Sequence, residues 1–169
     1  MLTDKVKKLA TEMGNELNNI LDYWINRTID NTNGGFYGQI TGNNQLVPEA
    51  HKGVILNTRI LWTFSSAYRV THNPNYKEIA DRAKNYILKH FIDYEMDGVY
   101  WSLDYKGNPL ETKKQIYAQS FAIYAFSEYY KIEKDETYGN VETESAVKWG
   151  VSPMNESYNW TNRSLSASR

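Results

Sequence analysis

The 169-residue chain contains no cysteine, which excludes disulfides, thiolate metal sites and cysteine nucleophiles together. It also lacks a long apolar run. The N-terminal segment MLTDKVKKLATEMGNELNNIL mixes charged and apolar residues, so neither a signal peptide nor a membrane span is predicted. Neither sign of charge is in clear excess, because the chain has 19 Lys and Arg residues and 20 Asp and Glu residues. We therefore expect no nucleic-acid partner, no membrane partner and a cytoplasmic location.

Apolar and aromatic residues are abundant, and their spacing predicts four helices of two kinds. With 41% hydrophobic and 14% aromatic residues, the chain has enough apolar surface for one domain. The segments of about 3–28 and 74–91 are amphipathic, so each should have one solvent-exposed face. The segments of about 50–71 and 113–133 are apolar or aromatic on most sides, which predicts helices buried all round. The order is therefore outer, inner, outer, inner.

A short extended segment precedes each predicted inner helix and forms part of an internal repeat. GGFYGQITGNNQLV and DGVYWSLDYKGNPL each place aromatic residues around a Gly/Asn turn, which predicts two small β-hairpins. RILWTFSSAYRV superposes on FAIYAFSEYYKI at a shift of 62 residues. Such a repeat predicts an all-α protein, an α/α toroid whose inner ring surrounds a pocket rimmed by hairpins. An open solenoid of stacked helices is the alternative.

Arg59 interrupts the apolar segment GVILNTRILWTF, and no neighbour in sequence neutralises it. A guanidinium is tolerated in a core only with polar partners around it. One interpretation is an ion pair with a buried carboxylate, such as Glu49 or Glu128, that ties the inner helices together. The other is that Arg59 lines the pocket and donates hydrogen bonds to hydroxyls or to a developing oxyanion.

Tyr117 stands where the second hairpin meets its inner helix, so its phenol would point toward the mouth of the cavity. Tyrosine supplies both an aromatic face and a hydroxyl for a ligand. Core packing is the alternative, because the chain has 14 tyrosines. Trp62 and Trp101 have the same two interpretations, with packing favoured.

The three histidines are not placed as general bases. His51 is expected to begin an inner helix, His72 lies in the THNP turn, and His90 closes an outer helix, where a cation favours the helix dipole. Each is expected to be a surface or capping residue. Because there is also no metal-ligand spacing and no phosphate-binding glycine loop, we expect no metal and no cofactor.

The runs NGGFYGQITGNNQLVPEAHKGVILNTRILWTFSSAYR and YILKHFIDYEMDGVYWSLDYKGNPLETKKQIYAQSFAIYAFSEYY resemble the N-terminal part of the cellobiose 2-epimerases, in the N-acylglucosamine 2-epimerase superfamily. The resemblance covers about residues 15–135. It implies part of an (α/α)6 barrel with a sugar site inside the ring. It also implies an isomerase that interconverts the C2 configuration of the reducing-end glucose of cellobiose and related β-1,4-disaccharides through a cis-enediol.

The resemblance also carries residue roles. Arg59, in NTRILW, matches an arginine that lines the family's active site and helps to bind the sugar, and Tyr117, in KKQIYAQSFAIY, matches a tyrosine near the same site. Family members are more than twice as long as this chain. Their catalytic histidines lie beyond the part that this sequence matches, so no catalytic residue is assigned here.

These observations lead to expectations for the whole chain. Residues 1–137 should form an incomplete α/α-barrel domain of the epimerase type, and residues 138–169 a divergent, partly disordered tail. We expect a disaccharide or other small sugar as ligand, no activity of the chain alone, and either self-association or pairing with a complementing C-terminal part. A non-catalytic sugar-binding or interaction module, and a truncated product without function, are the alternatives.

Overall fold

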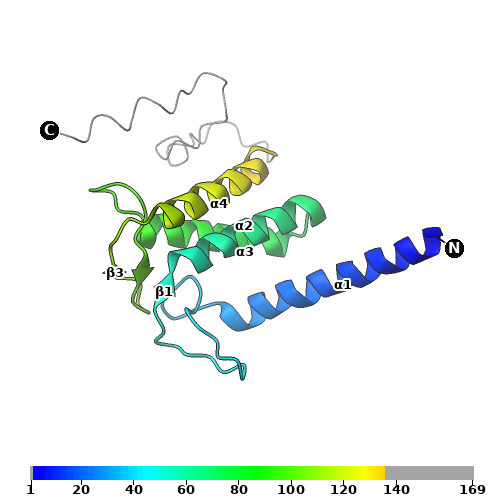
Figure 1. The fold of residues 1–169 in the computed structure, drawn as a ribbon, viewed down its shortest axis with the longest axis horizontal. Coiled ribbons are helices and arrows are strands. Elements are labelled where there is room, and N and C mark those ends of the chain that lie inside the picture. The colour runs from blue at the N-terminus through cyan, green and yellow to red at the C-terminus, as the bar shows by residue number, and fades with distance from the viewer. Residues whose placement is uncertain (1, 136–169) are drawn as a thin grey trace, which may run out of the picture.

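Helices make up most of the computed structural model, which describes residues 2–135 (Figure 1). Within that range the helices are α1 (Leu2–Thr28), α2 (Val54–Thr71), α3 (Pro74–Tyr86) and α4 (Ile116–Asp135). The end of α3 widens into a π-helical turn, η1 (Ile87–Phe91). The predicted all-α class and the four helices are confirmed. The predicted tail at 138–169 lies outside the described residues.

The helix boundaries follow local capping chemistry. α3 begins with Pro74 in its first turn, and the side chain of Asn73 accepts a hydrogen bond from the backbone N–H of Asn75. α2 ends at Thr71, and the C-cap residue His72 adopts the left-handed conformation at φ 55° and donates its N–H to the Tyr68 carbonyl. The short THNP segment therefore stops one helix and starts the next.

α2 lies at the centre of the packing, with α3 on one side and α4 on another (Figure 1). This arrangement confirms the alternation of outer helices (α1, α3) and inner helices (α2, α4). Buried apolar side chains come from all four helices and from the connecting loops. The fully buried ones are Leu21, Phe36, Val54, Leu61, Phe64, Ala80, Ala83, Ile87, Phe91, Val99, Leu103, Ala118, Ala125 and Ile132.

Three short strands gather at the end of the bundle where α2 and α4 begin (Figure 1). β2 (Ser102–Leu103) and β3 (Pro109–Glu111) form the second predicted hairpin, and β1 (Lys52–Gly53) joins it along β2, all antiparallel. The first predicted hairpin is reduced to one bridge, Ile40 with Leu46. Its turn residues are mostly exposed, so little apolar burial is available to extend a ladder there.

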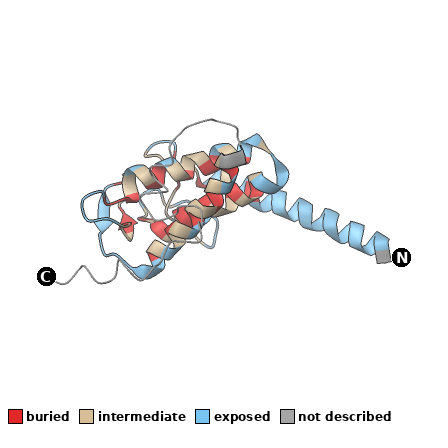
Figure 2. Ribbon diagram, turned by 90° about the horizontal axis from the view of Figure 1, so that it is seen from above, coloured by how far each residue is buried: buried red, intermediate tan, exposed pale blue. Residues whose placement is uncertain are grey.

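The predicted burial is wrong in two places (Figure 2). The amphipathic pattern of α1 implies a buried face, but its apolar stripe is exposed: Val6, Leu9, Met13, Leu17 and Ile20. Only the last two turns of α1 reach the core. α2 and α4 are not buried all round either, because Arg59, Tyr117 and Tyr124 are exposed. In both places no described element covers the surface.

Within residues 2–135, no helix combines the length and apolar character needed to cross a membrane. The cytoplasmic location stays a prediction.

Candidate functional site

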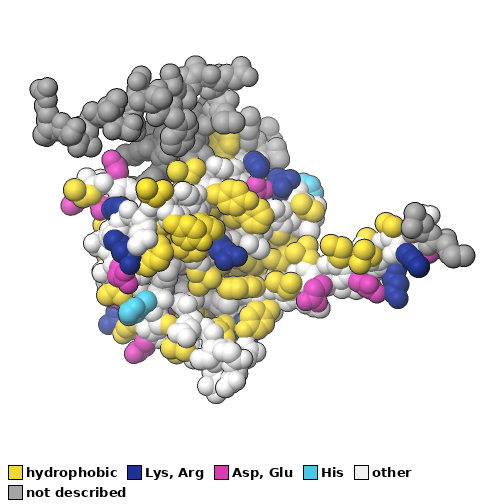
Figure 3. Space-filling model, viewed as in Figure 1, with side chains coloured by type: hydrophobic (Ala, Val, Ile, Leu, Met, Phe, Trp, Pro, Cys, Tyr) yellow, Lys and Arg dark blue, Asp and Glu magenta, His cyan; other side chains and the backbone are white. Residues whose placement is uncertain are grey.

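One side of the bundle, shared by α2 and α4, is rich in exposed aromatic side chains (Figure 3). We call it the open face and define it by Arg59 and Trp62 on α2 and by Tyr117, Phe121 and Tyr124 on α4. Residues three or four apart on a helix lie on the same side, so these residues follow one stripe along each helix. In this view basic side chains lie among the apolar ones.

The aromatic residues of the open face contact one another in two pairs. Trp62 and Tyr124 stack across the two helices, with ring centroids 5.4 Å apart and an interplanar angle of 14°. Tyr117 and Phe121 pack edge to face on α4 at 4.9 Å. Both geometries are favourable for aromatic rings, so the surface is ordered by its own contacts.

Arg59 lies one turn before Trp62 and is exposed. Its guanidinium makes no hydrogen bond or ion pair with any residue of the described part. The ion-pair interpretation is wrong, because Glu128 binds Arg69 at 2.8 Å and Lys131 at 2.6 Å instead. Burial tends to raise the pKa of Glu128, but these two cations outweigh it and lower that pKa. Arg59 is therefore available for a ligand.

Tyr117 is 58% exposed, so the core-packing interpretation is wrong for this residue. Within residues 2–135 its hydroxyl has no hydrogen-bond partner. Trp62 is half-buried and stacked, while Trp101 is half-buried beside the ammonium of Lys113, 5.1 Å from the ring centroid. Trp101 is thus a packing residue. Trp62 packs against Tyr124 and also forms part of the open face.

An ion pair fixes the chain just before α2, and we call it the first clamp: Asp30 with Lys52. The Lys52 ammonium donates to the Asp30 carboxylate at 2.8 Å and to the Gly34 carbonyl at 2.7 Å, and both side chains are completely buried. The ammonium also lies 5.0 Å from the centre of the Tyr86 ring. Burial tends to raise the pKa of Asp30, but hydrogen bonds from Asn33 and Lys52 lower it overall.

An equivalent pair, the second clamp, fixes the chain before α4: Asp93 with Lys114. The ammonium donates to the carboxylate at 2.6 Å and lies 4.3 Å from the Tyr100 ring centroid. Hydrogen bonds from Lys114 and from the Met96 backbone lower the pKa of Asp93 to about 2. Tyr117 follows Lys114 by three residues, so this clamp holds the segment that presents it.

The clamps confirm the internal repeat in three dimensions. Asp30 and Asp93 each accept hydrogen bonds from backbone N–H groups two and three residues further on. Each turn also closes with one antiparallel bridge, Ile29 with Phe36 and Ile92 with Val99. Sequence reasoning missed the clamps. The signal was present, because each Ile-Asp pair recurs after 63 residues and the lysines recur after 62.

None of the three histidines is part of the open face. His51 is exposed ahead of β1 and does not begin a helix, and His72 caps α2. His90 is half-buried, with Nδ1 3.0 Å from the Gly107 carbonyl oxygen. Burial lowers its pKa, although the hydrogen bond with the Gly107 carbonyl acts in the opposite direction. Among residues 2–135, no group of three or more His, Asp or Glu side chains is arranged to hold a metal ion.

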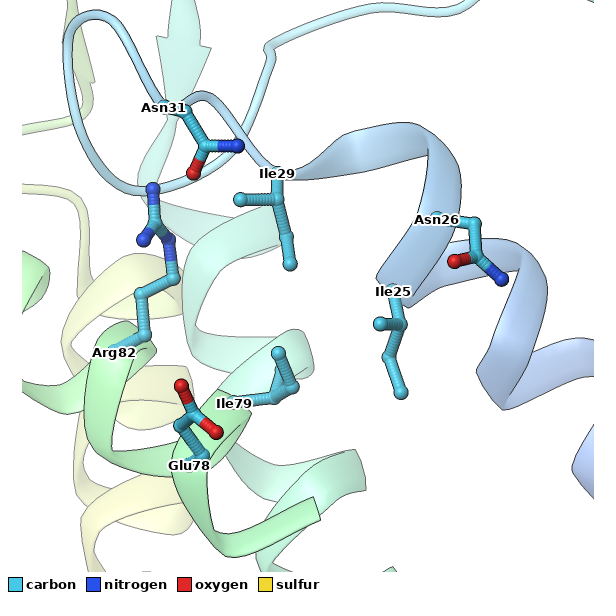
Figure 4. Close-up of a pocket in the computed structure, with 7 residues that line it drawn as sticks. All are labelled: Ile25, Asn26, Ile29, Asn31, Glu78, Ile79 and Arg82. Atoms are coloured by element: carbon cyan, nitrogen blue, oxygen red, sulfur yellow. The ribbon is translucent and has the colours of Figure 1, made fainter. Parts of the chain in front are cut away.

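A hollow of about 340 Å³ lies between the end of α1 and α3, the two outer helices (Figure 4). Its cationic residue, Arg82, already has hydrogen-bond partners, because its guanidinium donates to the carbonyl of Gly35 at 3.0 Å and to that of Asp30 at 2.6 Å. Arg82 therefore braces the first turn. The open face, with its unpaired polar groups, remains the candidate site.

Alternating outer and inner helices, with hairpins at the inner-helix starts, define the class of the protein: part of an α/α toroid. Residues 35–149 match the family model of the N-acylglucosamine 2-epimerases (GlcNAc 2-epimerase), which is more than half of the chain. The chain belongs to this family.

Relatives in the family show how much of the ring is present. A cellobiose 2-epimerase from Bacteroides fragilis is 57% identical over 128 residues, which cover 75% of this chain and 33% of that protein. The crystal structure of a sugar epimerase from a ruminal bacterium superposes with a TM-score of 0.75 at 38% identity, covering 85% of this chain and 35% of the other. The cellobiose 2-epimerase of Spirochaeta thermophila gives 0.73 at 34% identity, covering 80% and 34%. These neighbours are (α/α)6 barrels, and this chain spans about a third of their length, so its fold is a partial (α/α)6 toroid.

Proposed function

We propose that this chain is the sugar-binding arc of a cellobiose 2-epimerase. The complete ring would interconvert glucose and mannose at the reducing end of cellobiose and related β-1,4-disaccharides. It would do so by removing and returning the C2 proton through a cis-enediol. The likeness to cellobiose 2-epimerases supports the substrate class, and the open face supports the site.

The observation that carries the proposal is the unpaired guanidinium of Arg59 on the open face. A guanidinium is a planar fork of donors that cannot lose its proton near neutral pH. It therefore suits sugar hydroxyls in the ground state and an enediolate oxygen as negative charge develops. The Tyr117 hydroxyl, held close to the second clamp, adds a second hydrogen-bonding group at the same end of the inner helices.

The arc supplies binding and charge stabilisation without proton transfer. Moving the C2 proton between faces needs positioned acid–base groups, each worth about 10² to 10⁴ in rate. Arg59 cannot accept a proton, and a phenol with an ordinary pKa of about 10 is a poor base at neutral pH. All three histidines of the chain lie elsewhere. Activity would therefore depend on acid–base groups from the remaining two thirds of the ring. The relatives contain that part in addition to the part that this chain matches.

The uncovered surfaces indicate where those further helices would pack. In a closed ring both flanks of an arc are covered, so the apolar stripe of α1 would meet another ring segment, while the open face would line the central pocket. The α1 stripe offers five exposed apolar side chains for such a contact. Without that segment, we expect the stripe to associate with a second copy of the chain.

A chimera tests the proposal. The matched third of the Bacteroides fragilis enzyme is replaced by the 128 matched residues of this chain, and the epimerisation of cellobiose is measured. We expect activity that is lost in the Arg59→Ala chimera and kept in the Arg82→Lys chimera, because Arg82 lies on the outer side. A folded chimera that binds cellobiose but does not epimerise it would contradict the proposed activity.

A further inference from the structure

The parallel stack of Trp62 and Tyr124 leaves one aromatic surface uncovered. The two residues occupy equivalent positions in the two repeats, so they lie at the same height on neighbouring inner helices. One face of the Tyr124 ring lies against Trp62. Tyr124 is nevertheless 56% exposed, so its other face and its hydroxyl are accessible.

Polar groups without partners lie on the same side of the two helices. Arg59 is one turn closer to the start of α2 than Trp62, and Tyr117 is two turns closer to the start of α4 than Tyr124. Within residues 2–135, neither the guanidinium nor the two tyrosine hydroxyls make a hydrogen bond. An apolar aromatic surface therefore lies beside three exposed polar groups that have no protein partner in the described part of the chain.

A pyranose ring matches this combination chemically. It carries an apolar face of C–H groups and a rim of hydroxyls, so it needs an aromatic surface and hydrogen-bonding groups at once. Dry packing between helices would not need the Tyr124 hydroxyl, because an aliphatic side chain would fill the same space without a polar group to satisfy.

We infer that the Trp62–Tyr124 stack is a carbohydrate platform, on which the C–H face of a pyranose ring lies against the free face of Tyr124. The sugar hydroxyls then point toward Arg59 and Tyr117. The inference rests on the proposed function and deepens it by adding the apolar half of the sugar site. Because stacking requires a ring, the platform selects cyclic sugars over open-chain polyols.

A titration of the full chain tests the platform. Cellobiose is added, and the indole N–H signal of Trp62 is followed by NMR, after assignment with a Trp62→Phe variant. Sorbitol serves as a hydroxyl-rich probe without a ring. We expect a saturable shift with cellobiose and none with sorbitol.

Variants of the stack separate stacking from packing. Tyr124→Leu keeps an apolar side chain but removes the aromatic face, and we expect cellobiose affinity to fall about fivefold or more. Tyr124→Phe keeps the face and should retain most of the affinity. Tyr94→Leu, at a tyrosine that is 61% exposed in the Asp93 turn, is the matched control and should bind as the parent does. Thermal unfolding of each variant checks that the fold is intact.

The platform would be overturned by unchanged affinity in Tyr124→Leu, by an equal response to sorbitol, or by no saturable shift with cellobiose. These results are separable from a failure of the proposed function. A Tyr124→Leu chimera with parental kcat and KM would remove the platform and leave the epimerase. Cellobiose binding that depends on Tyr124, together with an inactive chimera, would keep the platform and remove the epimerase.

Discussion

At the scale of single residues, Arg59 shows how exposure decides between two roles. A guanidinium inside an apolar helix is either paired in the core or directed at a ligand. The carboxylate of Glu128 is occupied by Arg69 and Lys131, while Arg59 is exposed beside aromatic rings. Its position is therefore consistent with the ligand-binding role that we propose for it.

Arg59→Lys in the chimera should lose most of the epimerase activity, by about 100-fold in kcat. An ammonium keeps the charge but cannot reproduce the planar fork of donors. Arg69→Lys is the matched control, because Arg69 pairs with Glu128 and does not belong to the open face. Full activity of the Arg59→Lys chimera would remove Arg59 from the site.

A residue can be singled out from the sequence where its type conflicts with its surroundings. Arg59 in an apolar run is such a conflict, and it was found as a candidate. The clamps were not found, because a lysine beside a turn is ordinary in sequence and only three-dimensional contact reveals its buried carboxylate. The failed burial predictions have another cause, since an apolar pattern shows which face can be buried but not whether a covering element is present.

At the scale of elements, the clamps join each turn to the inner helix that follows it. Lys52→Met should destabilise the fold by about 3–5 kcal/mol, because it leaves the buried Asp30 carboxylate without its partner. Lys114→Met is the matched variant and should cost less, since that lysine side chain is 30% exposed. Urea unfolding measures both. A Lys52→Met loss no larger than that of Lys114→Met would contradict the structural role assigned to the first clamp.

Acid should weaken both clamps. A carboxylate with a lowered pKa in the folded state stabilises fully above its unfolded pKa, and this contribution is lost as the pH falls through the folded pKa. For Asp93 the window runs from about pH 4 down to about pH 2, and Asp30 shifts in the same direction. Urea midpoints across this window should fall less steeply for Asp93→Asn than for the parent. Equal slopes would show that Asp93 does not contribute.

The sequence predicted the helices better than the hairpins. Helices of 13 to 27 residues repeat their apolar spacing several times, so the signal accumulates. The strands have only two or three residues and offer no period to read. The joining of β1 to the second hairpin depends on how the two repeats pack, which no local pattern encodes.

At the scale of the whole molecule, the arc exposes surfaces that a closed ring covers. Figure 2 shows the N-terminal part of α1 exposed and projecting from the bundle. We expect the purified chain to self-associate, since burying each of these apolar side chains is worth about 1.5–3 kcal/mol. Leu9→Lys with Met13→Lys should shift light scattering toward the monomer, while Thr11→Lys with Asn15→Lys adds the same charge on the other side of α1 and should not. A dilution-resistant monomer of the parent chain would contradict this expectation.

The central claim is that this arc binds the sugar without supplying the groups that move its C2 proton. The most direct measurement is C2 proton exchange: cellobiose is incubated with the purified chain in deuterated water and followed by proton NMR, with the chimera measured in parallel. The account predicts exchange at the buffer rate for the chain alone and rapid exchange for the chimera. Exchange by the chain alone above the buffer rate, abolished by Arg59→Ala, would show that the arc contains a base and would contradict the account.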